Sequence, residues 1–589
     1  MDTSRIRTYF DRTRMRTNRR ILAGLTVVIA TASALAVLTG IGGFKATSAS
    51  SIKSAAARTT LVVLEDQLSK GLDWDGGASA NMQLNEFALN MYDGLVTFAT
   101  KPTGTGNFRP IYDKFVGRLA TSWSNHGNTW TFHLRKGVRS CAGNELTSKD
   151  VVFTFARAKS VSGVAPIAWF FSNVANVLGP EVLAKGATAK TKQLKGEVVA
   201  AGRYTVKIKT KPNNGQLLPM LSMFGLGIID STAAKKAATS KDPWAHAWLD
   251  KGGVGFGAYC LKSYQPGTSA TLTANSRYYG GQPQFRTVIL RAVPQDANRV
   301  ASIQSGQADI AVNLAPVEFN KIKQSGRASV LGEFNNRNIG LAMNYKIAPW
   351  GPRSNKARLI RQAVAYAIPY DEIIKQDYFG AARRWWGLVP SVYPGYVGTP
   401  HRYDTNIAKA KSLLAKAGYP NGKGLPAAGL SLTYVAERQS TLQPTATRIR
   451  TALARIGISI QLNPIPASEF ATRYATSHDM PFYMVDNNVA LGPEPGYSID
   501  LLFLPGRLGG LDDSANYDSP TVNRLYLKAK NVQPPRRYTI LKPAQETLMT
   551  DLPWIPLLES KTQIAVRRGI KGWVLGPNNA LTFWGFKGG

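Results

Sequence analysis

Helical and strand patterns alternate through the second half of the chain. From about Gln295, the segments NRVASIQSGQADIAVNL and ATRIRTALARIGISIQLNPIP each predict a helix that runs into a strand. In the second segment Ile449, Leu453 and Ile456 share one helix face, and a glycine separates that helix from the alternating strand ISIQL. Repeated helix-then-strand units fold with their helices packed on a sheet. This half of the chain is therefore expected to form an α/β lobe.

The first half of the chain is richer in strands. ATSWSNHGNTWTFHLRKGV predicts a hairpin whose turn is HGN, and AYCLKSYQPGTSATLTANSRYY predicts further alternating strands. LTSKDVVFTFARAKS predicts a helix, because Thr147 and Asp150 have capping-box spacing ahead of an apolar helix face. The chain has 589 residues, and single cores stop growing at about 250–300 residues. We therefore expect two or more packed cores.

The N-terminal residues have the layout of an export segment. Residues 1–20 carry seven arginines against two aspartates, residues 21–44 are almost uncharged, and residues 45–59 form a linker rich in small residues. The apolar part is also long enough to span a bilayer, which takes about 20 residues. Two outcomes stay open: cleavage within residues 46–57, or retention as an anchor with the arginines in the cytoplasm. No cysteine is near enough for a lipoprotein anchor, and in either case the body is expected outside the cytoplasm.

The formal net charge is +36, which raises the possibility of a nucleic-acid binder. The chain has no run of five Lys or Arg, no zinc-finger spacing and no basic helix ahead of heptads. We therefore expect no nucleic-acid partner, and we interpret the charge as the solvated surface of a basic exported protein.

Motifs for catalysis and cofactors are missing from the sequence. It has no G-x-S-x-G, no G-x-x-x-x-G-K-[ST] and no H-E-x-x-H, and its five histidines have no ligand spacing. The glycines between Gly253 and Gly257 precede a strand pattern, whereas a dinucleotide site needs a helix there. We expect no enzyme activity, no cofactor and no metal site.

Several segments, read in order, resemble a known family. They are NMYDGLV, LATSWSNHGNTWTFHLRKGV, GFGAYCLKSYQPG, ANSRYYGG, RQAVAYAI, AKSLLAKAGYPNG and ALARIGISIQL. Together they resemble the family 5 extracellular solute-binding proteins of ABC importers, the dipeptide/oligopeptide/nickel-binding group. The resemblance runs from about Leu61 to Pro556.

The resemblance implies a two-lobed α/β fold like that of periplasmic binding proteins (type II, cluster C). Lobe 1 would hold residues 60–305 with the return of residues 551–589, and lobe 2 would hold residues 306–550. The chain would cross between the lobes soon after Gln295 and again near Pro556, and the lobes would close on a ligand by a hinge.

The same resemblance implies a function outside the cytoplasm: a monomer captures oligopeptides in the inter-lobe cleft and delivers them to an ABC permease. Two alternatives stay open. The fold could bind a non-peptide ligand such as an opine, a sugar conjugate or another anion. The chain could also be a membrane-anchored surface interaction protein without a transport role.

Candidate ligand residues in lobe 2 come from the family's peptide-binding loop. In peptide-binding members an Asp in this loop pairs with the peptide ammonium, ahead of an Asp-Pro pair. Here Glu494 takes the place of the Asp in that pair, and the earlier Asp is replaced by Leu491 and Gly492. Asp486 and Asn487 are the nearest polar candidates. The departure leaves room for a neutral or anionic ligand.

Further candidates are Trp385 and Trp386 in lobe 2, and Trp74 and Asp75 in the first loop of lobe 1. Adjacent tryptophans offer a large stacking surface to a ligand. The alternative is that they pack in the core or at the hinge. The neighbouring Arg383 and Arg384 could face an anion or be solvated.

The two cysteines occupy positions that the family resemblance brings into one lobe. Cys141 stands where relatives carry His, and Cys260 lies in a lobe 1 strand. We expect a disulfide between them, with Cα atoms less than about 7 Å apart.

Overall fold

The computed structural model describes residues 58–75, 82–104, 106–160, 197–211, 216–222, 226–398, 402–487, 492–510, 513–576 and 579–588. The expected export segment, residues 1–44, and most of the linker lie outside this part of the chain. Among the described helices, none is both long enough and apolar enough to cross a membrane.

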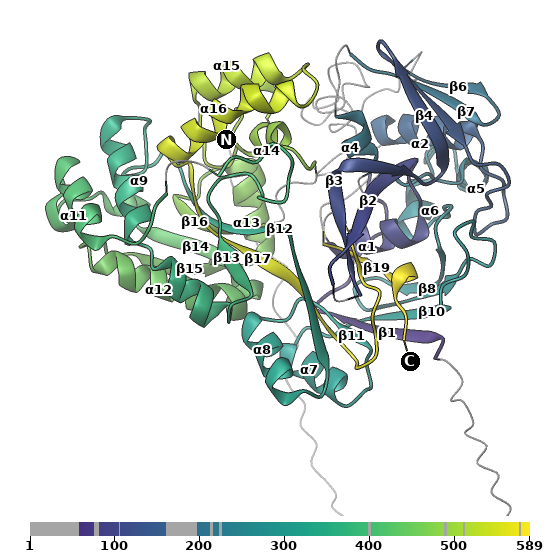
Figure 1. Cartoon of the computed structure of the whole chain (residues 1–589), viewed down its shortest axis with the longest axis horizontal. Coiled ribbons are helices and arrows are strands. Elements are labelled where there is room, and N and C mark those ends of the chain that lie inside the picture. Colours follow the sequence, from purple (N-terminus) through teal and green to yellow (C-terminus); the bar gives the residue numbers. More distant parts are fainter. Residues whose placement is uncertain are drawn as a thin grey trace, which may run out of the picture. The chain divides into compact units, whose positions relative to one another are not determined.

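One large mixed sheet runs through the described part of the chain (Figure 1). Its strand order is β15-β14-β16-β12-β17-β11-β1-β10-β9-β8, and β13 pairs with β17 beside this path. The strands are β1 (Thr60–Glu65), β8 (Tyr259–Gln265), β9 (Ser269–Ala274), β10 (Thr287–Ala292), β11 (Ile310–Ala311), β12 (Ser329–Met343), β13 (Ala382–Arg384), β14 (Ser431–Val435), β15 (Gln461–Ile465), β16 (Phe482–Asn487) and β17 (Trp554–Val566).

The two longest strands, β12 and β17, connect the two ends of this sheet. They pair antiparallel from Ser329↔Val566 to Ala342↔Trp554. At one end β17 pairs with β11, which pairs in parallel with β1, and at the other end β12 pairs with β16. The backbone hydrogen bonds between β12 and β17 therefore hold the two halves of the sheet in one register.

We call the elements on the β1 side lobe 1. It adds two four-stranded sheets, with the orders β19-β18-β3-β2 and β4-β5-β7-β6. Their strands are β2 (Val96–Pro102), β3 (Phe108–Gly117), β4 (Ala120–His126), β5 (Thr129–Leu134), β6 (Val198–Gly202), β7 (Thr205–Lys209), β18 (Val574–Leu575) and β19 (Leu581–Thr582). The helices of lobe 1 are α1 (Met82–Met91), α2 (Ser148–Ser160), α4 (Leu217–Leu221), α5 (Ser231–Ala237) and α6 (His246–Asp250).

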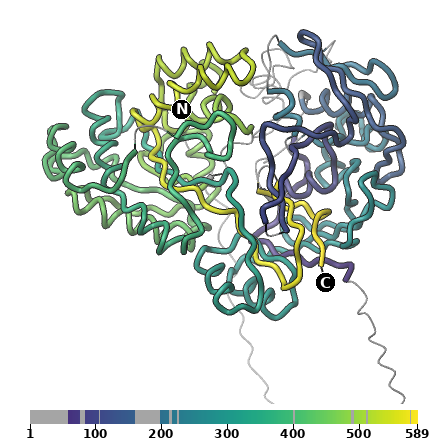
Figure 2. Tube along the Cα trace, viewed as in Figure 1, coloured from purple at the N-terminus to yellow at the C-terminus, as the bar shows by residue number. Residues whose placement is uncertain are grey.

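The expected hairpin and helix start in lobe 1 are confirmed. Strands β4 and β5 pair antiparallel on either side of the HGN turn. Asp150 accepts hydrogen bonds from the Thr147 backbone N–H (2.7 Å) and hydroxyl (3.0 Å), as the capping-box spacing predicts. The C-terminal residues also belong here, since Val574 of β18 pairs with Phe108 of β3. In Figure 2 the yellow C-terminal trace runs from α16 along β17 to this lobe.

We call the elements on the β16 side lobe 2. Its main helices are α9 (Asn355–Ala367), α11 (Ile407–Lys416), α12 (Gln439–Ala454), α13 (Ala467–Thr472), α14 (Pro495–Leu502), α15 (Pro520–Ala529) and α16 (Arg536–Asp551). The order α11, β14, α12, β15 confirms the predicted helix–strand alternation. Ile449, Leu453 and Ile456 are all buried, as their shared helix face requires.

Two short helices, α7 (Asp296–Gln304) and α8 (Pro316–Ser325), pack beside β12 and β17, which we call the hinge strands. They share a small apolar cluster with β1, β11 and β17, formed by Leu64, Ile303, Ala308, Ala311, Leu314, Phe319, Ile322, Ala328 and Ala565. Because these residues contact lobe 1 strands, we propose that lobe 1 extends to about residue 328. The crossings between the lobes would then be β12 and β17 themselves.

Cys141 and Cys260 form a disulfide, with Cα atoms 5.7 Å apart. It joins the loop after β5 to strand β8, and the Cys141 N–H also donates to the Gly255 carbonyl (3.3 Å). The bond closes a sequence separation of 119 residues.

Replacing both cysteines by serine should lower the free energy of unfolding by about 2–4 kcal/mol, because the closed loop restricts the unfolded chain. Urea denaturation of the two proteins measures this difference. Reductant should destabilise the natural protein and leave the double variant unchanged. Non-reducing peptide mapping that finds both thiols free would contradict the bond.

Candidate functional site

Residues of both lobes and of strand β12 line a gap between the lobes. A cavity of about 460 Å³ is bounded on the lobe 1 side by residues of β2 and β3 and on the other side by Arg383 and residues 391–394. An adjoining cavity of about 480 Å³ shares Lys101, Arg109 and Arg383, and adds Glu333 and Phe334 of β12. Both volumes lie in the range of small-molecule sites, about 300–1,000 Å³. We call these two cavities the inter-lobe gap.

Two buried tyrosines meet beside this gap, one from each lobe. The rings of Tyr112 (β3) and Tyr393 pack edge to face, with centroids 4.9 Å apart. The Tyr112 hydroxyl donates to the Asn335 side chain, and the Asn336 side chain donates to the Tyr393 hydroxyl (2.9 Å). Burial raises the pKa of both tyrosines, so both hydroxyls stay protonated.

The asparagines beneath the tyrosines continue this network to the C-terminal segment. The Asn335 amide donates to the Asn579 side-chain oxygen, and the Asn579 amide donates to the Asn336 oxygen, both at 2.9 Å. The Thr562 hydroxyl of β17 also donates to Asn579 (2.6 Å). Polar side chains of β3, β12, β17, lobe 2 and the C-terminal segment thus find hydrogen-bond partners in one buried network.

Asp486 lies at the end of β16 between two arginines. Its carboxylate is 2.6 Å from the Arg438 guanidinium and 3.5 Å from that of Arg337. Burial alone would raise the pKa of Asp486, but the two arginines outweigh it and hold the pKa below its usual value. Two positive groups therefore already balance the charge of Asp486, the acid nearest to the position where peptide-binding members carry the Asp that pairs with the ammonium.

The other candidates from the same loop are placed differently. The Asn487 backbone pairs with Asn338 of β12, whereas its side chain and residues 488–491 lie outside the described part of the chain. Glu494 is buried and makes two hydrogen bonds of 3.0 Å with Arg537. Arg537 also donates to the Ala529 and Lys530 carbonyls at the end of α15. Glu494 therefore joins α14 to α15 and α16.

The paired tryptophans are part of the packing of lobe 2. Trp385 is 2% exposed, and its indole N–H donates to the Val389 carbonyl (3.0 Å). The guanidinium groups of Arg384 and Arg402 lie 4.3 and 5.0 Å from the centroid of the Trp386 ring. Arg384 also stacks on Tyr370, 3.2 Å from its ring centroid. Neither tryptophan lines the inter-lobe gap, whereas the neighbouring Arg383 does.

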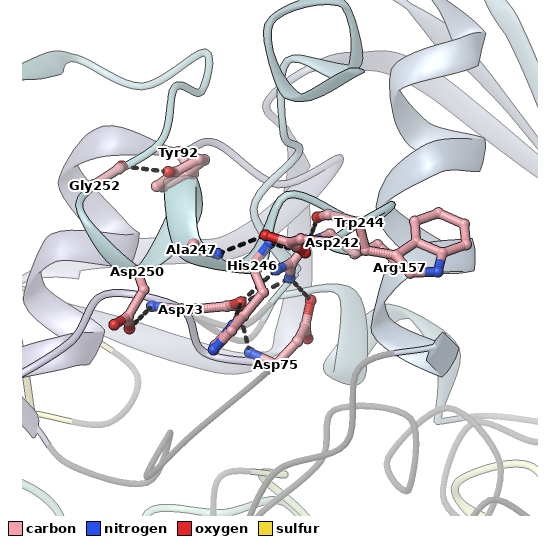
Figure 3. Close-up of polar contacts among 10 residues, drawn as sticks. All are labelled: Asp73, Asp75, Tyr92, Arg157, Asp242, Trp244, His246, Ala247, Asp250 and Gly252. Carbon is pink, nitrogen blue, oxygen red and sulfur yellow. Dashed lines mark hydrogen bonds and ion pairs between the residues drawn. The ribbon is translucent and has the colours of Figure 1, made fainter. Parts of the chain in front are cut away.

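Asp75 lies in the interior of lobe 1 (Figure 3). Its neighbour Trp74 is buried there as well. Trp74 is 1% exposed and packs edge to face on Tyr92, with centroids 4.6 Å apart. Asp75 and Asp73 both accept from the Arg157 guanidinium, at 2.8 and 2.9 Å.

Arg157 anchors this ionic network to the rest of lobe 1. Its Nε donates to the Trp244 carbonyl (2.8 Å). Asp73 also contacts Nδ1 of His246 at 2.5 Å, and His246 is the most exposed member of the network. The network holds the loop after β1 against α2 and α6.

The structure therefore does not bring the predicted ligand residues together. Trp74 and Asp75 lie inside lobe 1, Asp486 lies beside Arg337 and Arg438, and Glu494 lies against α16. Apart from Arg383, the residues of the inter-lobe gap were not predicted, because they come together only in the tertiary structure. Lys101 and Arg109 look like ordinary exposed residues of a hairpin until strand pairing sets them opposite each other.

No metal centre is found among the side chains that the structure describes, since no group of three or more His, Cys, Asp or Glu could hold an ion.

Burial raises the pKa of Asp75 to about 7, against the opposing effect of Arg157. The unfolded chain releases this proton near pH 3.8, so between these values the folded state binds more protons. The contribution of Asp75 to stability should therefore fall as pH rises from about 4 to about 7, by up to about 1.4 kcal/mol per pH unit. Asp75→Asn should make the pH dependence of urea unfolding shallower over this window.

The exposed Asp113→Asn is the matched control and should leave that dependence unchanged. An Asp75→Asn variant with the natural slope would show that Asp75 does not hold the proton.

A model of bacterial extracellular solute-binding proteins, family 5 Middle, matches residues 114–509. The Probable D,D-dipeptide-binding periplasmic protein DdpA of Escherichia coli is 24% identical over 471 residues, which cover 78% of this chain and 82% of that protein.

Solved periplasmic binding proteins confirm the expected two-lobed α/β fold. One is the ABC transporter-associated protein DppA from Helicobacter pylori in complex with the peptide STSA, with a TM-score of 0.71, 22% identity and coverage of 90% of this chain and 98% of that one. Another is AgaA from A. tumefaciens R10 in complex with agropinic acid, with a TM-score of 0.69, 22% identity and coverage of 90% and 99%. The chain therefore belongs to the family 5 bacterial extracellular solute-binding proteins, the solute-binding components of ABC importers.

Proposed function

We propose that this protein captures oligopeptides outside the cytoplasm and delivers them to an ABC permease in the membrane. The observation that carries this proposal is the inter-lobe gap, whose walls come from both lobes. A ligand bound there touches lobe 1 through β3 and lobe 2 through residues 391–394. Its binding energy then favours the closed arrangement of the lobes, which the permease recognises.

Peptide binding is supported by the comparisons and by the backbone around the gap. One relative is named for D,D-dipeptides, and one solved neighbour holds the peptide STSA. An extended peptide can add main-chain hydrogen bonds to an exposed strand. Residues 109–113 of β3 line the gap; β3 pairs with β2 over residues 108–111 and 115–117 and with β18 only at Phe108, so the edge of residues 109–113 away from β2 has no strand partner among the described residues.

A non-peptide anion is the second candidate ligand. The solved neighbour with agropinic acid supports this alternative. The pairing of Asp486 with Arg337 and Arg438 also supports it, because no free carboxylate is left there for a peptide ammonium.

The protein acts in this proposal as a monomer without enzymatic activity. Export would depend on residues 1–59, by cleavage or by retention of residues 21–44 as an anchor. Mass spectrometry of the N-terminus of the cell-derived protein distinguishes the two.

A thermal-shift screen of peptides, opines, sugar conjugates and metal ions tests the proposed function. A ligand at about 100 times its Kd should stabilise the folded protein by about 2.7 kcal/mol. If no member of these libraries raises the melting temperature, the proposed capture of oligopeptides loses its support and a surface interaction role gains support.

A tryptophan placed in the gap tests its location. Val392 lines the gap, so Val392→Trp should fill it and weaken the binding of any peptide found in the screen at least tenfold, measured by calorimetry. Val317→Trp is the matched control, since Val317 is 36% exposed on α8. Natural affinity in Val392→Trp would place the ligand elsewhere.

A further inference from the structure

Two neighbouring helices of lobe 2 carry several cations and no acid. α9 and α11 lie side by side (Figure 1), and the Asn406 N–H before α11 donates to the Tyr366 carbonyl near the end of α9 (2.7 Å). Each helix contains three Lys or Arg, and neither contains an Asp or Glu. Arg361 is buried, and the other five side chains are exposed or partly exposed. We call these five the α9–α11 basic face: Lys356, Arg358, Lys409, Lys411 and Lys416.

Two cations of the α9–α11 basic face are held by aromatic rings rather than by carboxylates. The Lys409 ammonium lies 4.1 Å from the ring centroid of Tyr366 and donates to the Tyr366 hydroxyl (2.7 Å). At the other end of the helix pair, the Lys356 ammonium lies 4.3 Å from the ring centroid of Tyr419. A cation–π contact orients a cation but does not neutralise it. Both lysines therefore keep their full charge at the surface.

The ion pairs of the described residues do not neutralise this face. Those closest to the face in sequence join Arg353 to Asp551 and Arg448 to Asp377. Within this part of the chain, none of the five cations of the face forms an ion pair. The acid nearest to α11 in the sequence is Asp404, one negative charge against five positive ones. The face is therefore complementary to an anionic surface.

The other side chains of this face favour a membrane over a soluble polyanion. Four apolar or aromatic side chains are partly exposed on the two helices and just after α11: Leu359, Tyr366, Leu413 and Tyr419. A soluble polyanion needs only the cations. At the boundary of a bilayer, lysines bury their apolar stems and reach the headgroups with their charges, and tyrosine rings lie at headgroup level.

We propose that the α9–α11 basic face docks on an anionic membrane surface. Residues 21–44 are long and apolar enough for a bilayer anchor, which would keep the body of the protein next to such a surface. Docking would raise the effective concentration of the protein near a membrane permease. The inference goes beyond the proposed function, because it does not depend on which ligand the inter-lobe gap takes.

Vesicle co-sedimentation tests the docking with the body of the protein, residues 57–589, which forms a compact unit of its own. The body should bind vesicles of phosphatidylglycerol and phosphatidylcholine at least tenfold more tightly than vesicles of phosphatidylcholine alone. Sodium chloride at about 1 M should release it, because the Debye length then falls to about 3 Å. Equal binding to both kinds of vesicle would overturn the proposal.

Charge-removing variants locate the contact. Lys409→Gln, Lys411→Gln, Lys416→Gln should lower the partition coefficient on the anionic vesicles about 100-fold, since each Lys near such a surface contributes roughly fivefold. The matched control, Lys207→Gln, Lys209→Gln, Lys262→Gln, removes the same charge from exposed positions of β7 and β8 in lobe 1 and should bind like the natural protein.

The same loss of binding in both triple variants would show that net charge alone drives binding, and would overturn the assignment to α9 and α11. No loss in either variant would overturn it as well. The charge-preserving Lys409→Arg, Lys411→Arg, Lys416→Arg variant should bind like the natural protein. It shows that charge rather than altered packing of α11 causes the loss in the glutamine variant, and weak binding by this arginine variant would contradict the electrostatic contact.

Inorganic polyphosphate separates a membrane from a soluble polyanion as the partner. The anionic vesicles should bind the body more tightly than polyphosphate does at equal phosphate concentration. If the body binds polyphosphate through the three α11 lysines but does not bind the vesicles, the membrane proposal is wrong. Ligand binding in the thermal-shift screen should be the same in the natural protein and in the glutamine variant, so a failure of docking leaves the proposed function standing.

Discussion

The antiparallel pairing of β12 with β17 is the constraint on which the rest of the structure depends. These strands are continuous from the part of the sheet that contains β1 to the part that contains β16. Every residue of lobe 2 is therefore attached to lobe 1 through two adjacent strands. Two strands in one ladder resist sliding along each other but permit bending and twisting, which is the geometry that hinge closure requires.

The buried tyrosine–asparagine network lies on this hinge. Asn335 and Asn336 are consecutive residues of β12, and their side chains contact Tyr112 of lobe 1 and Tyr393 of lobe 2. A buried amide that loses its partner costs about 1–3 kcal/mol. A movement of the lobes that separates these partners has to exchange the hydrogen bonds for others, with water or with a ligand. This coupling connects occupancy of the gap to the position of the lobes.

Local features of this fold were predictable from sequence, and the composition of the gap was not. The β4–β5 hairpin, the Thr147–Asp150 cap and the helix–strand order of lobe 2 follow from patterns within about twenty residues. Residue type alone suggested Trp385 and Trp386 as stacking surfaces, but Trp385 is buried and Trp386 already makes cation–π contacts with Arg384 and Arg402. The partners of Asp486 come from β12 and the residue before α12, which no local pattern connects. Arg383 was recognised as a possible anion contact, but its companions Lys101 and Arg109 lie more than 270 residues away in the chain.

Closure of the lobes on a ligand is the central claim of this account, and a distance measurement between them tests it most directly. Spin labels at Val199 in lobe 1 and Leu527 in lobe 2 use side chains that are 37% and 49% exposed. Pulsed electron paramagnetic resonance then gives the distribution of distances with and without the tightest ligand from the screen. The account predicts a shorter and narrower distribution when the ligand is bound. An identical distribution in both states would contradict it.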